Sequence, residues 1–144
     1  AQYGFKTVKP EAICEVECDI FCPCAVGGIL NDKTIPKLKC KLVAGCANNQ
    51  LEDEERHSRM LQARGILYAP DYVINAGGVI QAIDEAQGYN PERVKMKTDR
   101  IYGRLLQIFE IAKKEGILPL EAANRYAESR IREIHKMKRL YVPK

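Results

Sequence analysis

The amino-acid sequence predicts an α/β fold built on a short parallel β-sheet. Three short apolar runs have the length and composition of buried strands, and small or turn-forming residues follow each of them; they cover residues 18–21, 42–44 and 66–68. Stretches with helical character separate these runs, most clearly residues 52–64. Strands that alternate with helices favour parallel pairing. We therefore predict about three short parallel strands with flanking helices.

The second half of the chain predicts helices. A helix is expected over residues 71–88. Asn90 and Pro91 then form a strong helix start, because asparagine caps free amide groups and proline fits the first helical position. Apolar residues recur at one-face spacing up to Gly116, which fits the end of that helix, and Pro119 can open a last one. The last two helices are long for so small a sheet, so we expect their apolar faces to pack on another domain or subunit.

Charge and composition narrow the class of protein. The 144 residues include 23 basic and 19 acidic side chains, for a net charge of +4. The basic residues gather near the carboxyl end among glutamates, which is more typical of a solvated or subunit-facing helix than of a nucleic-acid interface. No apolar run approaches the ~20 residues of a membrane span, and the first residues show no secretion signal. We therefore predict a cytoplasmic protein that binds neither nucleic acid nor membrane.

The six cysteines are many for a chain of this length. Cys18, Cys22 and Cys24 lie in one segment, but their spacing is not the paired CxxC of a structural zinc site. Both histidines are far away in sequence, in stretches expected to be exposed helix. Because others, such as Cys40 and Cys46, lie among apolar residues, we predict mainly reduced, buried thiols and no metal site. A cysteine-based metal or redox protein is a minor alternative.

Small and polar residues follow each predicted strand, at residues 23–25, 45–49 and 69–78. In open parallel sheets, ligands bind beyond the carboxyl ends of the strands. Small residues let the backbone approach a flat ligand, and asparagine offers donors and an acceptor on one group. This chemistry suits a carboxamide such as nicotinamide, or the ammonium and carboxylate groups of an amino acid. Turns and helix caps are the competing explanation for each asparagine taken alone.

Three segments carry a resemblance to a known family. They are Cys-Asp-Ile-Phe-Cys-Pro-Cys-Ala at residues 18–25, Ala-Gly-Cys-Ala-Asn-Asn-Gln-Leu at 44–51, and Tyr-Ala-Pro-Asp-Tyr-Val-Ile-Asn-Ala-Gly-Gly-Val-Ile at 68–80. Their sequence, order and spacing resemble the glutamate/leucine/phenylalanine/valine dehydrogenases, with the leucine branch closest. The likeness runs from about residue 8 to residue 134. It implies a partial Rossmann-like domain.

The resemblance also implies an activity and a set of site residues. The activity is NAD-dependent oxidative deamination of leucine-like aliphatic L-amino acids to 2-keto acids and ammonia, in a homo-oligomer that serves branched-chain amino-acid catabolism. Five residues would bind the cofactor: Cys24, Ala25, Asn48, Asn49 and Asn75. Three would contact the substrate, the last two from one helical face: Asn49, Val79 and Ala82.

Two departures from the family's pattern bear on function. Ala82 stands where leucine-specific relatives usually carry valine. Alanine leaves more room, and pocket methylenes are worth ~1–3 kcal/mol in discrimination, so we hypothesise tolerance of bulkier or longer side chains. Cys22 and Cys46 stand where alanine or serine is usual. These are nearly isosteric replacements, which should preserve packing but add sensitivity to oxidation.

The sequence lacks motifs that the complete reaction needs. No GxGxxG turn is present to hold a pyrophosphate, and the lysine and aspartate that the family uses for catalysis have no counterpart in a matching motif. We therefore assign no catalytic residue, leave open whether the chain is itself an enzyme, and expect it to be inactive alone, as a fragment that needs an amino-terminal domain or companion chain. The predicted domains are a partial dinucleotide-binding domain at 1–88 and the carboxyl-terminal helices at 89–144. The alternative is a non-catalytic binding or oligomer-assembly module derived from the same fold.

Overall fold

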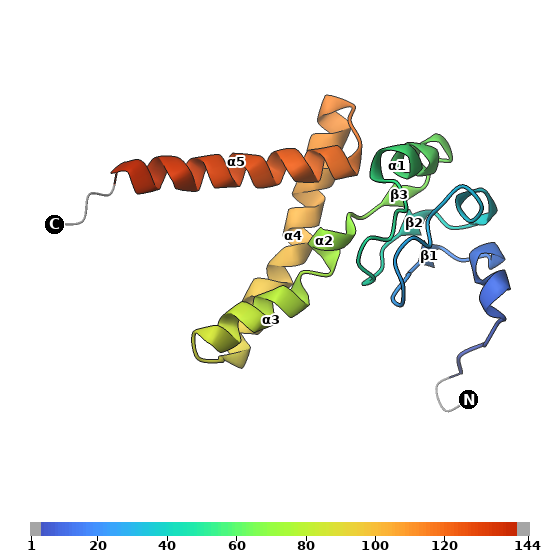
Figure 1. Ribbon diagram of the computed structural model, residues 1–144, viewed down its shortest axis with the longest axis horizontal. Helices are drawn as coiled ribbons and strands as arrows, with labels where there is room; N and C mark the ends of the chain where they lie inside the picture. The colour runs from blue at the N-terminus through green and yellow to red at the C-terminus, as the bar shows by residue number, and fades with distance from the viewer. Residues whose placement is uncertain (1–3, 141–144) are drawn as a thin grey trace. The chain divides into compact units, whose positions relative to one another are not determined.

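The computed structural model describes residues 4–140, with side chains described up to residue 137. The chain divides into two compact units, Ala1–Tyr68 and Ala69–Lys144. The first unit contains the sheet and the second is helical (Figure 1). The two units meet between Tyr68 and Ala69, earlier in the chain than the domain boundary predicted after residue 88. The domain boundary of the complete protein stays a prediction.

The first unit is built on the predicted parallel sheet. Its strands are β1 (Ile20–Phe21), β2 (Leu42–Val43) and β3 (Leu67–Tyr68), and they lie in the order β1-β2-β3 with both pairs parallel. Phe21, Val43 and Tyr68 form one row across the sheet, and all three are buried. In the other row, Ile20 and Leu67 are exposed. The α/β class with three short strands is therefore confirmed, and one face of the sheet carries the core of this unit.

Among the described residues of the first unit, three helical elements accompany the sheet: the 3-10 helices η1 (Pro10–Glu15) and η2 (Ile35–Lys37), and helix α1 (Glu54–Ala63). Helix α1 packs against β3 and η2, and it buries Leu61 completely. Arg64, at the end of α1, donates hydrogen bonds to the carbonyl oxygens of Ile35 and Leu38. The predicted helix at 52–64 is thus present, shortened by its caps.

The expectation that both histidines lie in exposed helix is wrong for His57, which is buried. Asp53 caps α1, since its carboxylate accepts a hydrogen bond from the backbone N–H of Arg56 at 2.8 Å. The cap folds back onto the first helical turn, and the backbone N–H of Asp53 donates to His57 Nδ1 at 2.8 Å. His57 Nε2 lies 3.4 Å from the Asp32 carboxylate. The buried His57 side chain therefore accepts the backbone N–H of the capping residue Asp53 and helps to fix the start of α1.

Between residues 69 and 140 the second unit contains four helices: α2 (Asp71–Ile74), α3 (Gly77–Ala86), α4 (Pro91–Glu115) and α5 (Pro119–Leu140). The single helix expected over residues 71–88 is wrong, because Asn75 and Ala76 interrupt it. The following Gly77-Gly78 pair has low helix propensity and offers no side chain to stabilise a continuous helix. The predicted ends of α4 are confirmed: Asn90 accepts from the N–H of Arg93 at 2.9 Å, and Gly116 is left-handed with φ 67°.

The core of the second unit lies where α4 meets α5. Ile108 and Ala112 of α4 are buried against Ala122 and Ala123 of α5, and small alanine side chains let the two helices approach closely. Figure 1 shows α5 crossing α4 near the turn that joins them. Large apolar side chains remain exposed farther along both helices, among them Tyr102 and Ile131. That another domain or subunit covers them stays a prediction.

Candidate functional site

In the first unit, the predicted site residues follow neighbouring strands. Cys24 and Ala25 come shortly after β1, and Asn48 and Asn49 come shortly after β2. Since β1 and β2 are parallel neighbours, both segments leave the same edge of the sheet. All four residues are exposed. This edge therefore presents an amide pair and a thiol to a ligand.

A close backbone approach shapes the loop that carries Asn49. The N–H of Gly28 donates to the carbonyl oxygen of Asn49 at 2.8 Å. A Cβ atom at Gly27 would lie 2.8 Å from the carbonyl oxygen of Asn48 and 2.9 Å from that of Asn49, which no side chain can tolerate. Asn49 itself adopts φ 52°, the only left-handed non-glycine residue among those described. Such backbone conformations persist where the surroundings impose them, and they are frequent at functional sites.

A buried glutamine braces the same loop. Gln50 is completely buried, and its side-chain amide donates to the carbonyl oxygens of Gly45 at 2.7 Å and Ala47 at 2.9 Å. The backbone of Gln50 also accepts from the N–H of Leu30 at 2.9 Å. The loop from Gly45 to Gln50 is therefore fixed from below, while its two asparagines face outward.

The other predicted residues belong to the second unit. Asn75 is half-buried at the carboxyl end of α2, where its backbone N–H donates to the carbonyl oxygen of Asp71 at 2.9 Å. Val79 and Ala82 are exposed on α3 and, three residues apart, share one face of that helix. The interruption between α2 and α3 sets Asn75 at the turn rather than inside a helix.

A buried ion pair anchors α3. The Asp84 carboxylate is 0 % exposed and lies 2.5 Å from Arg93 Nε, with Lys97 Nζ at 3.6 Å. It also accepts from the backbone N–H of Asn90 at 2.8 Å. The hydrogen bond from Arg93 holds the pKa of Asp84 down at about 2, and the same contact raises the pKa of Arg93. The end of α3 is thereby tied to the start of α4.

Known proteins match this chain along nearly its whole length. The family model described as glutamate/leucine/phenylalanine/valine dehydrogenase matches residues 1–139. The chain belongs to this family. Leucine dehydrogenase of Thermoactinomyces intermedius is 55% identical over 98% of the chain, and L-tryptophan dehydrogenase of Nostoc punctiforme is 51% identical over 94%. Each alignment covers 38% of the relative, so the chain spans well under half the length of these amino-acid dehydrogenases.

Solved structures of dehydrogenases share the fold. The crystal structure of L-tryptophan dehydrogenase from Nostoc punctiforme superposes with a TM-score of 0.86 at 53% identity, over 88% of this chain and 38% of that one. A hetero-hexameric glutamate dehydrogenase from Thermus thermophilus gives a TM-score of 0.72 at 19% identity, over 98% of this chain and 35% of that one, and this likeness concerns the fold alone. The partial Rossmann-like fold is thus shown.

The cysteines of this chain differ from the expectation of mainly buried thiols. Cys14 and Cys40 are buried, but Cys22, Cys24 and Cys46 are exposed, and Cys18 is intermediate. The apolar neighbours of Cys46 turn inward while its own side chain follows the outward side of the strand-end loop. Among residues 4–140, no group of three or more His, Cys, Asp or Glu side chains has an arrangement that could hold a metal ion.

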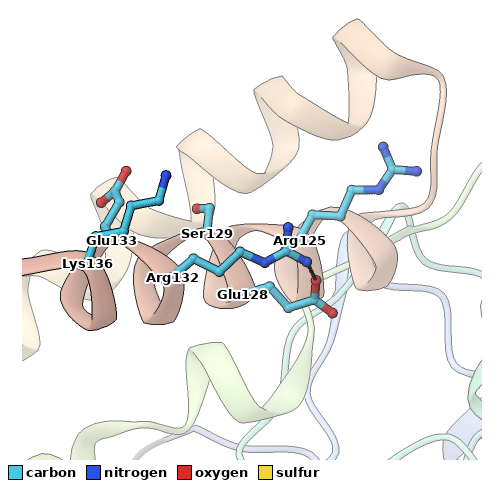
Figure 2. A pocket seen from close by; sticks show the side chains of 6 residues that line it. All are labelled: Arg125, Glu128, Ser129, Arg132, Glu133 and Lys136. Carbon is cyan, nitrogen blue, oxygen red and sulfur yellow. Dashed lines mark hydrogen bonds and ion pairs between the residues drawn. The ribbon is translucent and has the colours of Figure 1, made fainter. Parts of the chain in front are cut away.

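The basic carboxyl-terminal helix of this family member carries a shallow charged groove. Figure 2 shows its lining, all from α5: Arg125, Glu128, Ser129, Arg132, Glu133 and Lys136. Arg132 pairs with Glu128 at 3.1 Å, and Arg125 pairs with Glu115 and Glu121, each at 2.6 Å. The cations thus alternate with carboxylates along a solvated face. No helix within the described part of the chain is long and apolar enough to cross a membrane.

Several residues that shape the candidate site were not singled out from the sequence. They are Gly27, Gly28, Gln50, Asp84 and Arg93. The Gly-Gly pair ahead of a buried leucine was a detectable signal for a close backbone approach. Asp84 and Arg93 lie nine residues apart across a turn, a spacing that no helical periodicity relates, so only the structure reveals this pair.

Proposed function

We propose that this chain forms the nicotinamide end and one wall of the substrate pocket in an NAD-dependent amino-acid dehydrogenase. The observation that carries the proposal is the loop around Asn49, which follows the carboxyl end of a strand in a parallel sheet. The side-chain amide of Asn49 is exposed and its backbone is left-handed. A close contact with Gly27 and hydrogen bonds from the buried Gln50 side chain hold the loop. A loop constrained in this way presents its amide without further ordering on ligand binding.

The exposed groups fit the cofactor. A nicotinamide carboxamide needs one acceptor and one donor, and an asparagine side chain supplies both. Asn49 and Asn48 would hold the carboxamide, with Cys24 and Ala25 against the ribose and ring, and Asn75 would complete the nicotinamide end. The small Ala25 side chain leaves the backbone open to a flat ring.

The chemistry divides between the cofactor and the protein. When bound, NAD accepts a hydride from the α-carbon of the amino acid. The residues of this chain orient the two reactants: Asn49 would fix the nicotinamide and contact the substrate, and Val79 and Ala82 would exclude water around its side chain. No proton-transfer group is assigned here, so we propose that the catalytic lysine and aspartate belong to an amino-terminal domain or companion chain.

The proposed substrates are hydrophobic L-amino acids, with leucine-like aliphatic ones first, which would place the enzyme in cytoplasmic branched-chain amino-acid catabolism. Both groups proposed to face the substrate side chain, Val79 and Ala82, are apolar and exposed on α3. The small Ala82 favours tolerance of larger side chains. In an active enzyme, comparison of kcat/KM for valine, leucine and phenylalanine tests this; a strict preference for valine would contradict it.

A fusion tests the function directly. The amino-terminal part of the Thermoactinomyces intermedius leucine dehydrogenase is joined to this chain, and leucine-dependent reduction of NAD is followed by absorbance. We expect activity from the fusion and none from the chain alone. Turnover by the chain alone would contradict the division of catalytic groups, and a folded but inactive fusion would contradict the proposed function.

A matched pair of variants locates the site within that fusion. Asn49→Ala removes the proposed carboxamide contact, and we expect kcat/KM to fall by on the order of 100-fold, the usual loss for one positioned hydrogen-bond donor. Gln62→Ala removes an exposed amide on α1, outside the proposed site, and should leave kcat/KM unchanged. Equal effects of the two substitutions would remove Asn49 from the site.

We also propose that the exposed apolar faces of α4 and α5 are covered in a homo-oligomer or by the rest of the protein. Tyr102 is 72% exposed and Ile131 is 68% exposed, although both are large and apolar. A groove of about 380 Å³ opens between α2, α4 and α5, and its lining includes Val73, Ile108 and Tyr126. Size-exclusion chromatography with light scattering, applied to the fusion and to the chain alone, measures the oligomeric state. A monomeric fusion would contradict the homo-oligomer. An oligomeric chain whose fusion is inactive would favour the alternative of a non-catalytic assembly module.

A further inference from the structure

Helix α3 carries an apolar outer face that extends beyond the two residues proposed to contact the substrate. Val79 is 57% exposed and Ile83 is 51% exposed, and Ala82 and Ala86 are exposed as well. Because they are spaced three and four residues apart, these side chains are neighbours on the helix surface. Ile83 is the largest of them, and a continuous exposed apolar face of this kind is typical of a binding surface.

The opposite side of α3 is anchored on α4. The Asp84 carboxylate, which follows Ile83 in the chain, is 0% exposed and pairs with Arg93 of α4. Successive residues of an α-helix are about 100° apart around its axis, so Val79 and Ala82 lie on the side away from Asp84, and Ile83 lies beside Val79. Figure 1 shows α3 beside the start of α4. The buried ion pair therefore fixes the rotation of α3, and with it the direction of the apolar face.

The order of residues along α3 gives the apolar face a direction. Asn75, proposed for the nicotinamide end, precedes the helix. A helix rises about 1.5 Å per residue, so Ile83 lies about 6 Å farther from the start of α3 than Val79 does. A substrate with its α-carbon at the nicotinamide end would extend its side chain past Val79. The next large group on this face is Ile83.

We propose that Ile83 is a third substrate-facing residue, and that it limits the length of the side chain that the pocket accepts. The inference rests on the proposed function, in which Val79 and Ala82 contact the substrate. Isoleucine suits this role because its β-branched side chain keeps one strongly preferred rotamer in a helix. It presents a fixed apolar stop, whereas the methyl group of Ala82 leaves space at its side.

Ile83 and Ala82 then divide the selection of substrates. Ala82 sets the width of the pocket, and the tolerance that it allows ends in length at Ile83. An aliphatic side chain of leucine's length reaches Ile83 and buries apolar surface against it. A longer aromatic side chain meets the same group before its α-carbon reaches the nicotinamide. Relief would need a shift of α3, which the pair of Asp84 with Arg93 resists.

Substitutions of residue 83 in opposite directions test the length limit. The fusion with the amino-terminal part of the Thermoactinomyces intermedius leucine dehydrogenase is used, and kcat/KM is measured for valine, leucine and phenylalanine. Ile83→Ala should raise the kcat/KM ratio of phenylalanine to leucine by about 10-fold or more, as expected for space gained in an apolar pocket. Ile83→Phe shortens the pocket and should raise the ratio of valine to leucine by a similar factor.

Two further variants separate selection from stability. Ile83→Leu conserves volume and should leave both ratios nearly unchanged. Gln81→Ala is the matched control on the same helix, because Gln81 is exposed on the side away from Ile83, where its amide donates to Glu85 at 2.9 Å. This control should change neither ratio. A residue that only stabilised α3 would alter turnover of all three substrates alike, and thermal unfolding confirms that each variant is folded.

The outcomes distinguish this inference from the function on which it rests. A folded but inactive fusion would overturn the proposed function, and the role of Ile83 with it. An active fusion whose ratios are the same in Ile83→Ala and Ile83→Phe would overturn the length limit alone. Unchanged ratios together with an altered oligomeric state, measured by light scattering, would assign Ile83 to a subunit interface and would also overturn it.

Discussion

The strand-end loop of the first unit and the α3–α4 corner of the second are both rigid, but different forces hold them. The loop from Gly45 to Gln50 depends on backbone fit: atoms at Gly27 and Gly45 leave no room for a side chain, and a neutral amide binds two carbonyl oxygens. The corner depends on charge, because the buried Asp84 carboxylate pairs with Arg93 and Lys97 and accepts a hydrogen bond from the backbone N–H of Asn90. The loop should therefore respond to volume, and the corner to pH.

The largest expected effect comes from Gly45→Ala. The added Cβ would overlap the backbone of Pro23, so the strand ends must separate and the loop above them must move. We expect a loss of about 3 kcal/mol or more in the free energy of unfolding of the first unit, at the upper end of the range for overpacking. Urea unfolding measures the loss.

Gly103→Ala is the matched control for that substitution. Gly103 is exposed within α4, and a Cβ there meets no atom within 4 Å. Alanine should stabilise the helix by about 0.5–1 kcal/mol because it loses less backbone entropy on folding. Equal and small effects of the two substitutions would show that the contact of Pro23 with Gly45 is not a constraint.

The next effect separates the corner from the loop by pH. The pKa of Asp84 falls from 3.8 to about 2 on folding, so the ionised carboxylate stabilises the folded state above pH 4, and this contribution is lost as the pH falls from about 4 to about 2. Asp84→Asn should lower the unfolding midpoint at neutral pH and flatten its decline over that window. Thermal unfolding at a series of pH values measures both.

Asp99→Asn controls for the loss of a carboxylate at the surface. Asp99 pairs with Lys95 at 2.8 Å, but both side chains are largely exposed. This variant should keep the steep decline between pH 4 and pH 2. A decline that is unchanged in Asp84→Asn would mean that other carboxylates govern acid unfolding.

The sequence predicted the loop better than the corner, for a physical reason. Strand ends, turn residues and helix caps are local signals, so residues 23–25, the Asn48-Asn49 pair and the Asn90 start could be read directly. The corner depends on a contact between two helices, and Asp84 has no local feature that marks it as buried. The burial of His57 was not predicted either, because its bond from Asp53 is local but the fold alone brings Asp32 to its other ring nitrogen.

The break between α2 and α3 shows where periodicity failed. Apolar spacing continues through Asn75, yet the helix stops there because Gly77 and Gly78 weaken its continuation. The exposure of Cys46 was missed for a different reason: its neighbours Gly45 and Ala47 are buried, but the alternation of buried and exposed residues continues past Val43 and leaves Cys46 on the exposed side. Both errors concern the site, where strained or interrupted backbone is expected.

A third pair of changes compares the helix starts of the two units. Asp53→Ala and Asn90→Ala each remove a side chain that accepts from a backbone N–H at the start of a helix. We expect each to cost about 1 kcal/mol. Alanine at residue 90 keeps the backbone bond to Asp84, so the charged corner stays closed. Urea unfolding of both variants, with the pH profile of the second, checks this; a flattened profile in Asn90→Ala would show that cap and corner are coupled.

The smallest expected effect comes from the charged groove of α5. Arg132 pairs with Glu128 at 3.1 Å, but their side chains are 76% and 63% exposed. Water and salt screen such a pair, and two long side chains lose rotamer freedom to form it, so Arg132→Ala should change the free energy of unfolding by less than about 0.5 kcal/mol. Glu128→Ala should give the same result, and added salt should erase any difference. A loss above 1 kcal/mol that persists in high salt would mean that the aliphatic part of Arg132 packs against a surface, as expected if this face of α5 lies in an interface.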